Sequence, residues 1–390
     1  MPRFPDFAST AGSLSDSVYS RLAARARELD RPIYPLQVGD TWMEPHPAIR
    51  AEAQRTEDEA MLHTYAPVQG TPMLCKAILA KLERQGGRPL DPADLQVMSG
   101  ATVGLSVICQ TLLDPGDEVL LPAPYWPLIR GIIASRGGVP VEIPFWDRLG
   151  EEGFDAEAAI RAAITERTVA LYLNSPNNPT GRLLPEPIAA ALARVAAEHD
   201  LWIWSDEAYE DLIYVDDPPP PLWTREDFRE RCITSHTFSK SYGIAGARVG
   251  YTHGPHEVMK AIRGVQTFQS YNAPKPMQRA AARALGEAGE WLAEARAAYA
   301  RAGRLCAEAL GLPPPEGSTF FFFDVAPFFR EGEDLLAFLG RVLEETGVLL
   351  TPGSASGKDY PTHVRMCFTS VPPEKLEEAL GLLAPLLRAP

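Results

Sequence analysis

Between residues 90 and 255, short apolar runs alternate with helical patterns, and this alternation strongly limits the folds open to the chain. A helix is indicated by the Ala- and Leu-rich segment Leu183–Glu198. Apolar strands alternating with helices predict an α/β fold with a mostly parallel sheet covered on both faces. In such sheets, sites form at the carboxyl ends of the strands. The β-rich runs, each bounded by turn residues, are Glu118–Leu121, Thr168–Leu173, Leu201–Trp204 and Cys232–Thr234.

From about residue 275 the pattern changes to that of an α+β module. The Ala-, Arg- and Glu-rich stretch Gln278–Leu310 predicts one long helix or two, and an aromatic strand, Thr319–Asp324, follows it. Another helix near Glu333–Thr346, the strand His363–Phe368 and a final helix complete the module. Because 390 residues exceed one ordinary core, we expect two domains. We place a large domain at residues 46–274, and a small one at 275–390 together with 1–45.

Composition excludes some function classes. Lys and Arg total 37 against 51 Asp and Glu, and a net charge of -14 offers no broad surface for nucleic acid. The five cysteines are scattered without metal-ligand spacing, so we expect reduced thiols and no metal site. Residues 1–20 lack the apolar core of a signal peptide, and no run approaches 18 apolar residues. We therefore expect a cytoplasmic protein that does not associate with membranes.

The most informative segment is Ser235–Tyr251, which contains Lys240. A lysine that forms an imine must be held in place and shifted toward its neutral amine. Hydroxyls of Thr237 and Ser239 flank Lys240, and the Arg248 guanidinium is suited to a phosphate. A Ser-Lys pair by itself is far more often a solvated surface feature, so the rest of the chain must decide its meaning.

The segment resembles the S/T-x-S-K-x-x-G-x-x-G-x-R-x-G signature of fold-type I pyridoxal-phosphate enzymes, in the class I and II (aspartate aminotransferase-like) family. Further segments match in the family's order, among them Asn174–Gly181 (N-S-P-N-N-P-T-G) and Ser205–Tyr209 (S-D-E-A-Y). The resemblance implies a large domain with a seven-stranded, mostly parallel sheet and a smaller α+β domain. It also implies that Lys240 carries pyridoxal 5′-phosphate as a Schiff base.

The same resemblance assigns contacts to the cofactor ring. Asp206 would pair with the pyridine nitrogen, and Asn178 and Tyr209 would bind the phenolic oxygen. Trp126 would stack on the ring, with Tyr125 as the alternative. Considered without the family, these residues could be a turn, a helix cap and core aromatics. The residues assigned to catalysis are Lys240, Asp206 and Tyr209.

The phosphate group would bind at the start of the helical stretch that follows Met98. Free backbone N–H groups at a helix start form an anion site. The residues that match the family's phosphate cup are Gly100, Ala101, Thr102, Thr237 and Arg248. Tyr65 matches a tyrosine that reaches the phosphate of a partner subunit, which implies a homodimer with shared sites; the alternative is an exposed turn.

On the substrate side, Arg365 matches an arginine that clamps the α-carboxylate of an amino acid. Gly39 and Asn178 would also face the substrate. Ser356 stands where relatives often have phenylalanine, and no second arginine for a dicarboxylic substrate is evident. The identity of the substrate side chain is therefore left open.

The resemblance implies a transaminase that moves an amino group from an α-amino acid to a 2-oxo acid by a ping-pong mechanism. Two alternatives remain. A β-lyase, acting for example on cysteine conjugates, would use the same residues, since the cofactor is the electron sink for both reactions. A non-catalytic ligand-sensing module is disfavoured by the acidic charge and by the absence of DNA-binding helices before the domain.

Overall fold

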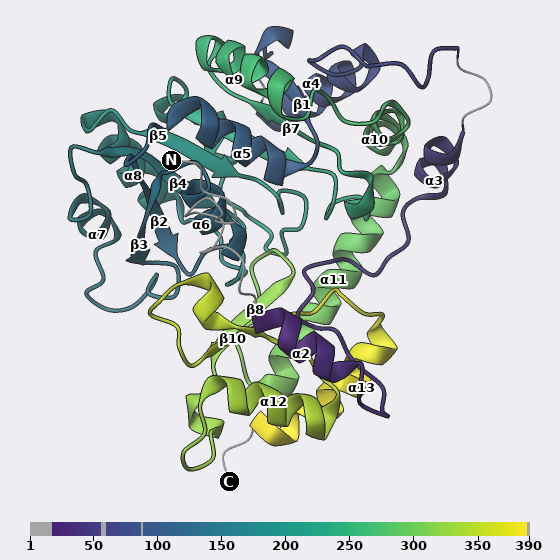
Figure 1. Ribbon diagram of the computed structural model, residues 1–390, viewed down its shortest axis with the longest axis vertical. Coiled ribbons are helices and arrows are strands. Elements are labelled where there is room, and N and C mark those ends of the chain that lie inside the picture. The colour runs from purple at the N-terminus through teal and green to yellow at the C-terminus, as the bar shows by residue number, and fades with distance from the viewer. Residues whose placement is uncertain (1–17, 56–59, 87–88, 388–390) are drawn as a thin grey trace, which may run out of the picture.

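A computed structural model describes residues 18–55, 60–86 and 89–387. Residues 1–17, on which much of the expectation about a leader peptide rests, lie outside the described residues. Two sheets organise the molecule (Figure 1). Within the part of the chain that the structure covers, no helix has the length and apolar character needed to cross a membrane.

The larger sheet has seven strands in the order β1-β7-β6-β5-β4-β2-β3. The five strands from β2 to β6 run parallel, whereas β7 is antiparallel to both β6 and β1. This arrangement confirms the predicted mostly parallel α/β sheet. The strands are β1 (Leu95–Met98), β2 (Glu118–Ala123), β3 (Val139–Pro144), β4 (Thr168–Asn174), β5 (Trp202–Asp206), β6 (Cys232–Thr237) and β7 (Gly250–His253).

All four strands that the apolar runs predict extend further at their carboxyl ends, β2 as far as Ala123. The run Leu201–Trp204 is in fact the strand Trp202–Asp206, and β4 and β6 also end on polar residues. Backbone pairing explains the extension, because Asn174 pairs with Asp206 and Asp206 pairs with Ser235. Apolar patterning therefore locates β2, β4, β5 and β6 but not β1, β3 or β7, and it misses the polar ends that face the site.

Helices cover both faces of this sheet. On one face, Val119 and Leu121 of β2 pack with residues of α5 (Ala101–Leu112), α6 (Pro127–Ala134) and α9 (His256–Gln269). On the other face, Leu120 packs with residues of α7 (Ala156–Arg161) and α8 (Glu186–Glu198). Neighbouring residues of β2 thus serve opposite cores, as the alternation of side chains along a strand requires.

The stretch from 275 to 310 forms two helices, α10 (Lys275–Glu287) and α11 (Gly289–Leu310), with Ala288 between them. Helix α10 packs against α3 (Pro47–Gln54) and α4 (Pro72–Gly86) at one end of the larger sheet. The ambiguity left by the sequence, one helix or two, is resolved in favour of two.

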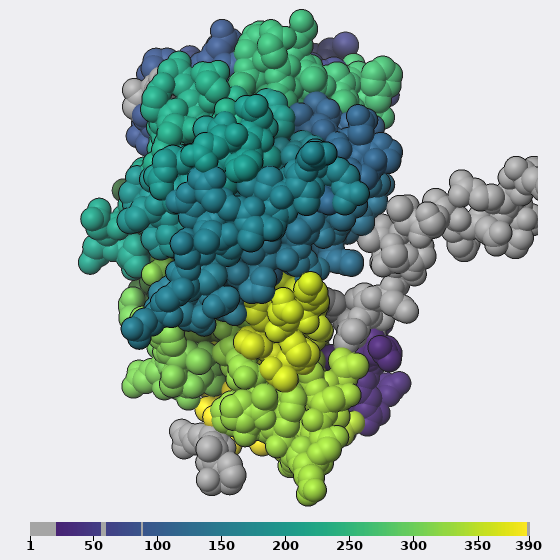
Figure 2. All heavy atoms as spheres, turned by 90° about the vertical axis from the view of Figure 1, so that its left-hand side faces the viewer, coloured from purple at the N-terminus to yellow at the C-terminus, as the bar shows by residue number. Residues whose placement is uncertain are grey.

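The smaller sheet is antiparallel, in the order β8-β10-β9, and it packs with helices of the C-terminal part of the chain. Backbone bonds from Tyr34 N to Gly347 O and from Cys367 N to Leu36 O attach the N-terminal segment to it. Figure 2 shows this part, in green and yellow, beneath the teal and blue residues of the larger sheet. Its elements are α2 (Val18–Ala26), β8 (Phe320–Asp324), α12 (Leu335–Thr346), β9 (Thr351–Pro352), β10 (His363–Cys367) and α13 (Pro373–Leu383).

Candidate active site

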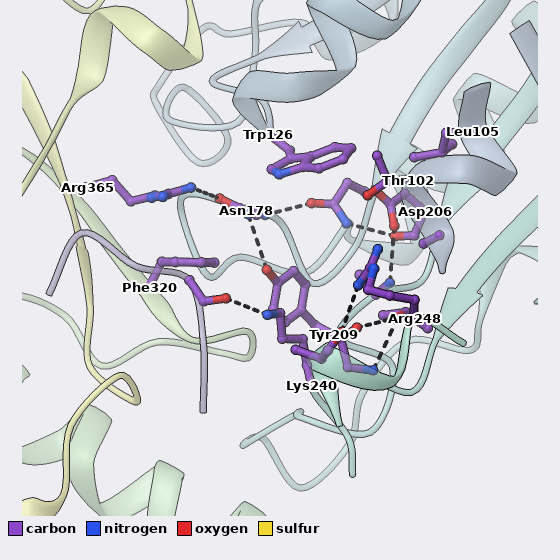
Figure 3. A pocket seen from close by; sticks show the side chains of 17 residues that line it. Thr102, Leu105, Trp126, Asn178, Asp206, Tyr209, Lys240, Arg248, Phe320 and Arg365 are labelled. Carbon is purple, nitrogen blue, oxygen red and sulfur yellow. Dashed lines mark hydrogen bonds between the residues drawn. The ribbon is translucent and has the colours of Figure 1, made fainter. Parts of the chain in front are cut away.

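A cavity of about 230 Å³ lies where the carboxyl ends of β4, β5 and β6 face the smaller sheet (Figure 3). Segments far apart in sequence contribute to its wall, from Gly39 near the N-terminus to Arg365 on β10. It gathers most of the residues singled out from the sequence: Gly39, Ala101, Thr102, Trp126, Asn178, Asp206, Tyr209, Thr237, Lys240, Arg248 and Arg365. Gly100 and Tyr65 are not among its lining residues.

Asp206, the last residue of β5, is a buried carboxylate with well-defined partners. Its Oδ2 accepts a 2.7 Å hydrogen bond from the Tyr172 hydroxyl, and Oδ1 accepts one of 3.3 Å from the backbone N–H of Ala208. Burial raises the pKa of Asp206 to about 6, while these bonds and the nearby His236 oppose that rise. The site thus offers a carboxylate whose charge a cationic partner would stabilise.

Asn178 connects the two sheets. Its Nδ2 donates to the Tyr209 hydroxyl at 3.2 Å, and its Oδ1 accepts from Arg365 Nη1 at 3.1 Å (Figure 3). Asn174 Oδ1 holds the backbone of Asn178 by accepting from its N–H at 2.7 Å. Burial raises the pKa of Tyr209, and the charge of Arg365 opposes this effect. These hydrogen bonds hold the Asn178 amide and the Tyr209 phenol in place. The family resemblance assigns both groups to the phenolic oxygen of the cofactor.

Arg365 is buried and oriented before any substrate binds. Its Nη2 donates to Gln37 O at 3.1 Å, and its guanidinium carbon lies 4.5 Å from the centre of the Phe320 ring. Its Nε has no hydrogen-bond partner among the described residues. A planar guanidinium held in this way, with a free donor, is suited to bind a carboxylate.

Lys240 follows β6 and points into the cavity, where its Nζ donates to the carbonyl of Gly39. Asp40 Oδ1 lies 3.7 Å from Nζ. Burial lowers the pKa of Lys240 and Arg248 acts in the same direction, whereas Asp40 opposes them. The surroundings therefore favour the neutral amine, which is the form able to attack a carbonyl.

An anion cradle lies at the N-terminus of α5. Its N-cap residue Gly100 has φ +85° and makes no side-chain capping bond, so the first N–H groups of the helix are available. A Cβ on Gly100 would lie only 2.6 Å from Arg248 Nη2, so glycine permits the guanidinium to approach the helix. Thr237 Oγ1 and Ser239 Oγ are 2.8 Å apart beside it. The group of donors suits a phosphate.

The two aromatic candidates differ in position. Trp126 lines the cavity, whereas Tyr125 is buried away from it and donates to Glu142 Oε1 at 2.7 Å. Tyr65 is 84% exposed, and its ring contacts that of Tyr271 at 4.9 Å between centroids. Within one chain Tyr65 is not among the residues that line the cavity, and its expected contact with the phosphate of a partner subunit stays a prediction.

Sequence reasoning missed two supporting residues. Tyr172 read as a core residue of its strand, yet alternation along β4 places it on the face of Asn174, next to the site. Gln37 binds Arg365 only through its backbone carbonyl. Because any residue type can supply a backbone carbonyl, the sequence gives no indication of this role. The one indication in the sequence was the polar residue Asn174 at the end of the strand, since Tyr172 two positions earlier must lie on the same face of the sheet.

Comparison with known proteins gives consistent matches. The family model described as aminotransferase class I and II matches residues 31–383. An aspartate/prephenate aminotransferase of Thermus thermophilus is 37% identical over 335 residues, 83% of each chain. An arginine–pyruvate transaminase of Pseudomonas aeruginosa is 32% identical over 377 residues, 93% of each. The structure of Thermus thermophilus aspartate aminotransferase with maleate superposes with a TM-score of 0.87 at 32% identity, covering 98% of this chain and 100% of that one.

Proposed function

Because the chain belongs to the class I and II aminotransferase family, we propose that it transfers amino groups between α-amino acids and 2-oxo acids with pyridoxal 5′-phosphate bound around Lys240. The observation that carries the proposal is one cavity shared by an amine of lowered pKa, a buried carboxylate, an anion cradle and an oriented arginine. Transamination needs all four groups in reach of one another.

The residues present fit this cofactor. The cradle at Gly100 and Arg248 would hold the phosphate, and the Asp206 carboxylate would pair with the pyridine nitrogen. Asn178 and Tyr209 would bind the phenolic oxygen, and Trp126 would cover the ring. Lys240 would hold the cofactor covalently as a Schiff base, which the low pKa of its amine favours.

When bound, the cofactor supplies an electron sink for the negative charge that develops at the substrate's α-carbon. Arg365 would bind the α-carboxylate, with Asn178 beside it, and so orient the bonds at the α-carbon. The Lys240 amine, once released, would accept the α-proton as general base. Asp206 would keep its negative charge, because Tyr172 and the Ala208 N–H stabilise it.

Relatives named as aminotransferases favour transamination over the β-lyase alternative. A single-turnover experiment separates the two reactions. Without an acceptor, a ping-pong transaminase should release one equivalent of 2-oxo acid per subunit and then stop, and an added 2-oxo acid should receive the amino group. Continued release of pyruvate and ammonia without an acceptor would instead identify a lyase.

We also propose that the active unit is a homodimer. Met61, Tyr65 and Phe268 are 70%, 84% and 92% exposed, and Tyr65 contacts Tyr271, three residues after Phe268. Large apolar side chains with this degree of exposure are often found at subunit interfaces. Sedimentation of the native chain and of a Phe268→Asp variant tests the proposal: the native chain should be dimeric and the variant should dissociate.

Two further expectations from the sequence remain proposals. The division into residues 46–274 and 1–45 with 275–390 is supported by the separate core around the smaller sheet. A cytoplasmic location is supported by five cysteines that are all free thiols. Limited proteolysis and fractionation of the source cells would test them.

A further inference from the structure

Charged side chains are few in the cavity wall. Among the described residues that line it, only Asp206, Lys240, Arg248 and Arg365 carry a formal charge. The other described residues that line it are uncharged. A charged substrate side chain would therefore have to pair with one of these four residues.

Two of the cations are committed to the cofactor under the proposed function. Arg248 lies against the N-terminus of α5, where a Cβ on Gly100 would come within 2.6 Å of its Nη2. Lys240 is engaged by Gly39 and would be bound to the cofactor. Neither is free to pair with a substrate carboxylate.

Arg365 is thus the remaining cation of the wall, and one carboxylate saturates it. Its Nη1 and Nη2 already donate to Asn178 Oδ1 and Gln37 O, and the Phe320 ring covers one face of the guanidinium. The unpartnered Nε and the adjoining edge of the guanidinium can receive the α-carboxylate that every amino acid carries. Among the described residues of one chain that line the cavity, a second carboxylate on the side chain finds no further cation.

A negative charge lies next to Lys240. Asp40 Oδ1 lies 3.7 Å from Lys240 Nζ, and the Asp40 side chain is 49% exposed. Its Oδ1 also accepts from the Thr41 N–H at 2.9 Å, which holds this oxygen near Lys240. With Lys240 bound to the cofactor, the Asp40 carboxylate would lack a free ammonium partner and would repel a second carboxylate on a substrate.

We propose that the enzyme acts on monocarboxylic α-amino acids with uncharged side chains and that Asp40 discriminates against dicarboxylic ones. This inference rests on the proposed function and names its substrate class. It separates the chain from relatives named aspartate aminotransferases and from the Thermus structure solved with maleate, which is a dicarboxylate.

Isosteric substrate pairs test the proposal on the holoenzyme, because only charge differs within each pair. We expect kcat/KM for asparagine to exceed that for aspartate, and glutamine that for glutamate, by about tenfold or more. The best uncharged amino acid of a panel with alanine, leucine, methionine and phenylalanine should exceed both acids by about a hundredfold. Aspartate or glutamate as the best substrate would overturn the proposal.

Ligand binding gives a readout independent of turnover. Calorimetry should show succinamate, the monoamide, binding the holoenzyme about tenfold more tightly than succinate. Equal or tighter binding of succinate would contradict the proposal.

The role of Asp40 is tested by Asp40→Asn, with Asp217→Asn as a matched loss of charge at an exposed aspartate that does not line the cavity. Asp40→Asn should raise the aspartate-to-asparagine ratio of kcat/KM by about tenfold, and Asp217→Asn should leave it unchanged. The ratio cancels any effect of Asp40 on Lys240 itself. An unchanged ratio in Asp40→Asn would overturn the assignment to Asp40.

Failure of every amino acid to yield a 2-oxo acid would contradict the proposed function, whereas efficient use of dicarboxylic acids would contradict only this inference.

Discussion

The Tyr172 hydroxyl donates a 2.7 Å hydrogen bond to Oδ2 of Asp206, and both side chains are buried. The two residues lie on neighbouring parallel strands, β4 and β5. Burial raises the pKa of Asp206 to about 6, and the bond from Tyr172 is the largest of the opposing effects. Tyr172 therefore helps to keep Asp206 ionised near neutral pH, as pairing with a pyridinium requires.

Tyr172→Phe should weaken cofactor binding, because Asp206 loses a donor that stabilises its charge. A hydrogen bond to a charged group contributes about 2 kcal/mol, so the Kd of pyridoxal 5′-phosphate should rise roughly thirtyfold. Titration of the apoenzyme by absorbance measures it. Tyr214→Phe is the matched control, since it removes a buried hydroxyl that donates to Ser318 O at 2.6 Å outside the cavity. Equal losses of affinity in both variants would contradict the role of Tyr172.

Asp206 should make the stability of the apoenzyme depend on pH. Its folded-state pKa, about 6, is raised above the ordinary value of 3.8, so the protein loses stability as pH rises from about 4 to about 6, and the loss is complete above that range. Asp206→Asn should therefore stabilise the apoenzyme by about 3 kcal/mol at pH 7.5, and the gain should shrink as pH falls toward 4. Urea unfolding of both apoproteins at several pH values measures the difference. A gain independent of pH would contradict the buried, ionising carboxylate.

Gly100→Ala should reduce cofactor affinity beyond its effect on stability. Gly100 has φ +85°, and an added Cβ would lie 2.6 Å from Arg248 Nη2. Gly116, at φ +97° with nothing within 4 Å of its Cβ position, gives a matched control, Gly116→Ala. Both variants should lose about 1 kcal/mol of unfolding free energy from backbone strain. Only Gly100→Ala should raise the Kd for the cofactor, by about tenfold; unchanged affinity would argue against a phosphate at this helix start.

Arg365→Lys should lower kcat/KM for amino acids by about two orders of magnitude while preserving the charge. An ammonium cannot reproduce the planar fork that Asn178 and Gln37 O orient. Steady-state kinetics with the best amino acid and cofactor titration together measure the effect, because cofactor affinity should remain near that of the native enzyme. Retention of native kcat/KM would show that Arg365 does not bind the substrate.

Much of the fold and the site follows from sequence patterns. Apolar runs located β2, β4, β5 and β6, and their alternation with helical patterns predicted the mostly parallel sheet, whereas β1, β3 and β7 were not among the predicted runs. The polar ends of β4 and β5 were missed, because pairing of Asn174 with Asp206 continues the ladder where hydrophobicity stops. The presence of Lys240 and Asp206 in one cavity could be expected only through the family resemblance, since nothing local in the sequence specifies which strand ends meet.

Other features depend on tertiary or intersubunit contacts that local patterns in the sequence do not reveal. Tyr172 looked like an ordinary strand residue until its hydroxyl was placed on Asp206. The backbone carbonyl of Gln37 holds Arg365 across 328 positions, and any residue type could supply it. Tyr65 lies outside the cavity of its own chain, so its inferred role depends on a second subunit.

The most direct measurement maps the site of cofactor attachment. Borohydride reduction of the holoenzyme followed by peptide mass spectrometry should place one pyridoxyl group per chain on Lys240, and Lys240→Ala should lose both the adduct and transamination. Lys260→Ala, which removes an exposed lysine of α9, should retain both. An adduct on another lysine, or near-native transamination by Lys240→Ala, would contradict the account.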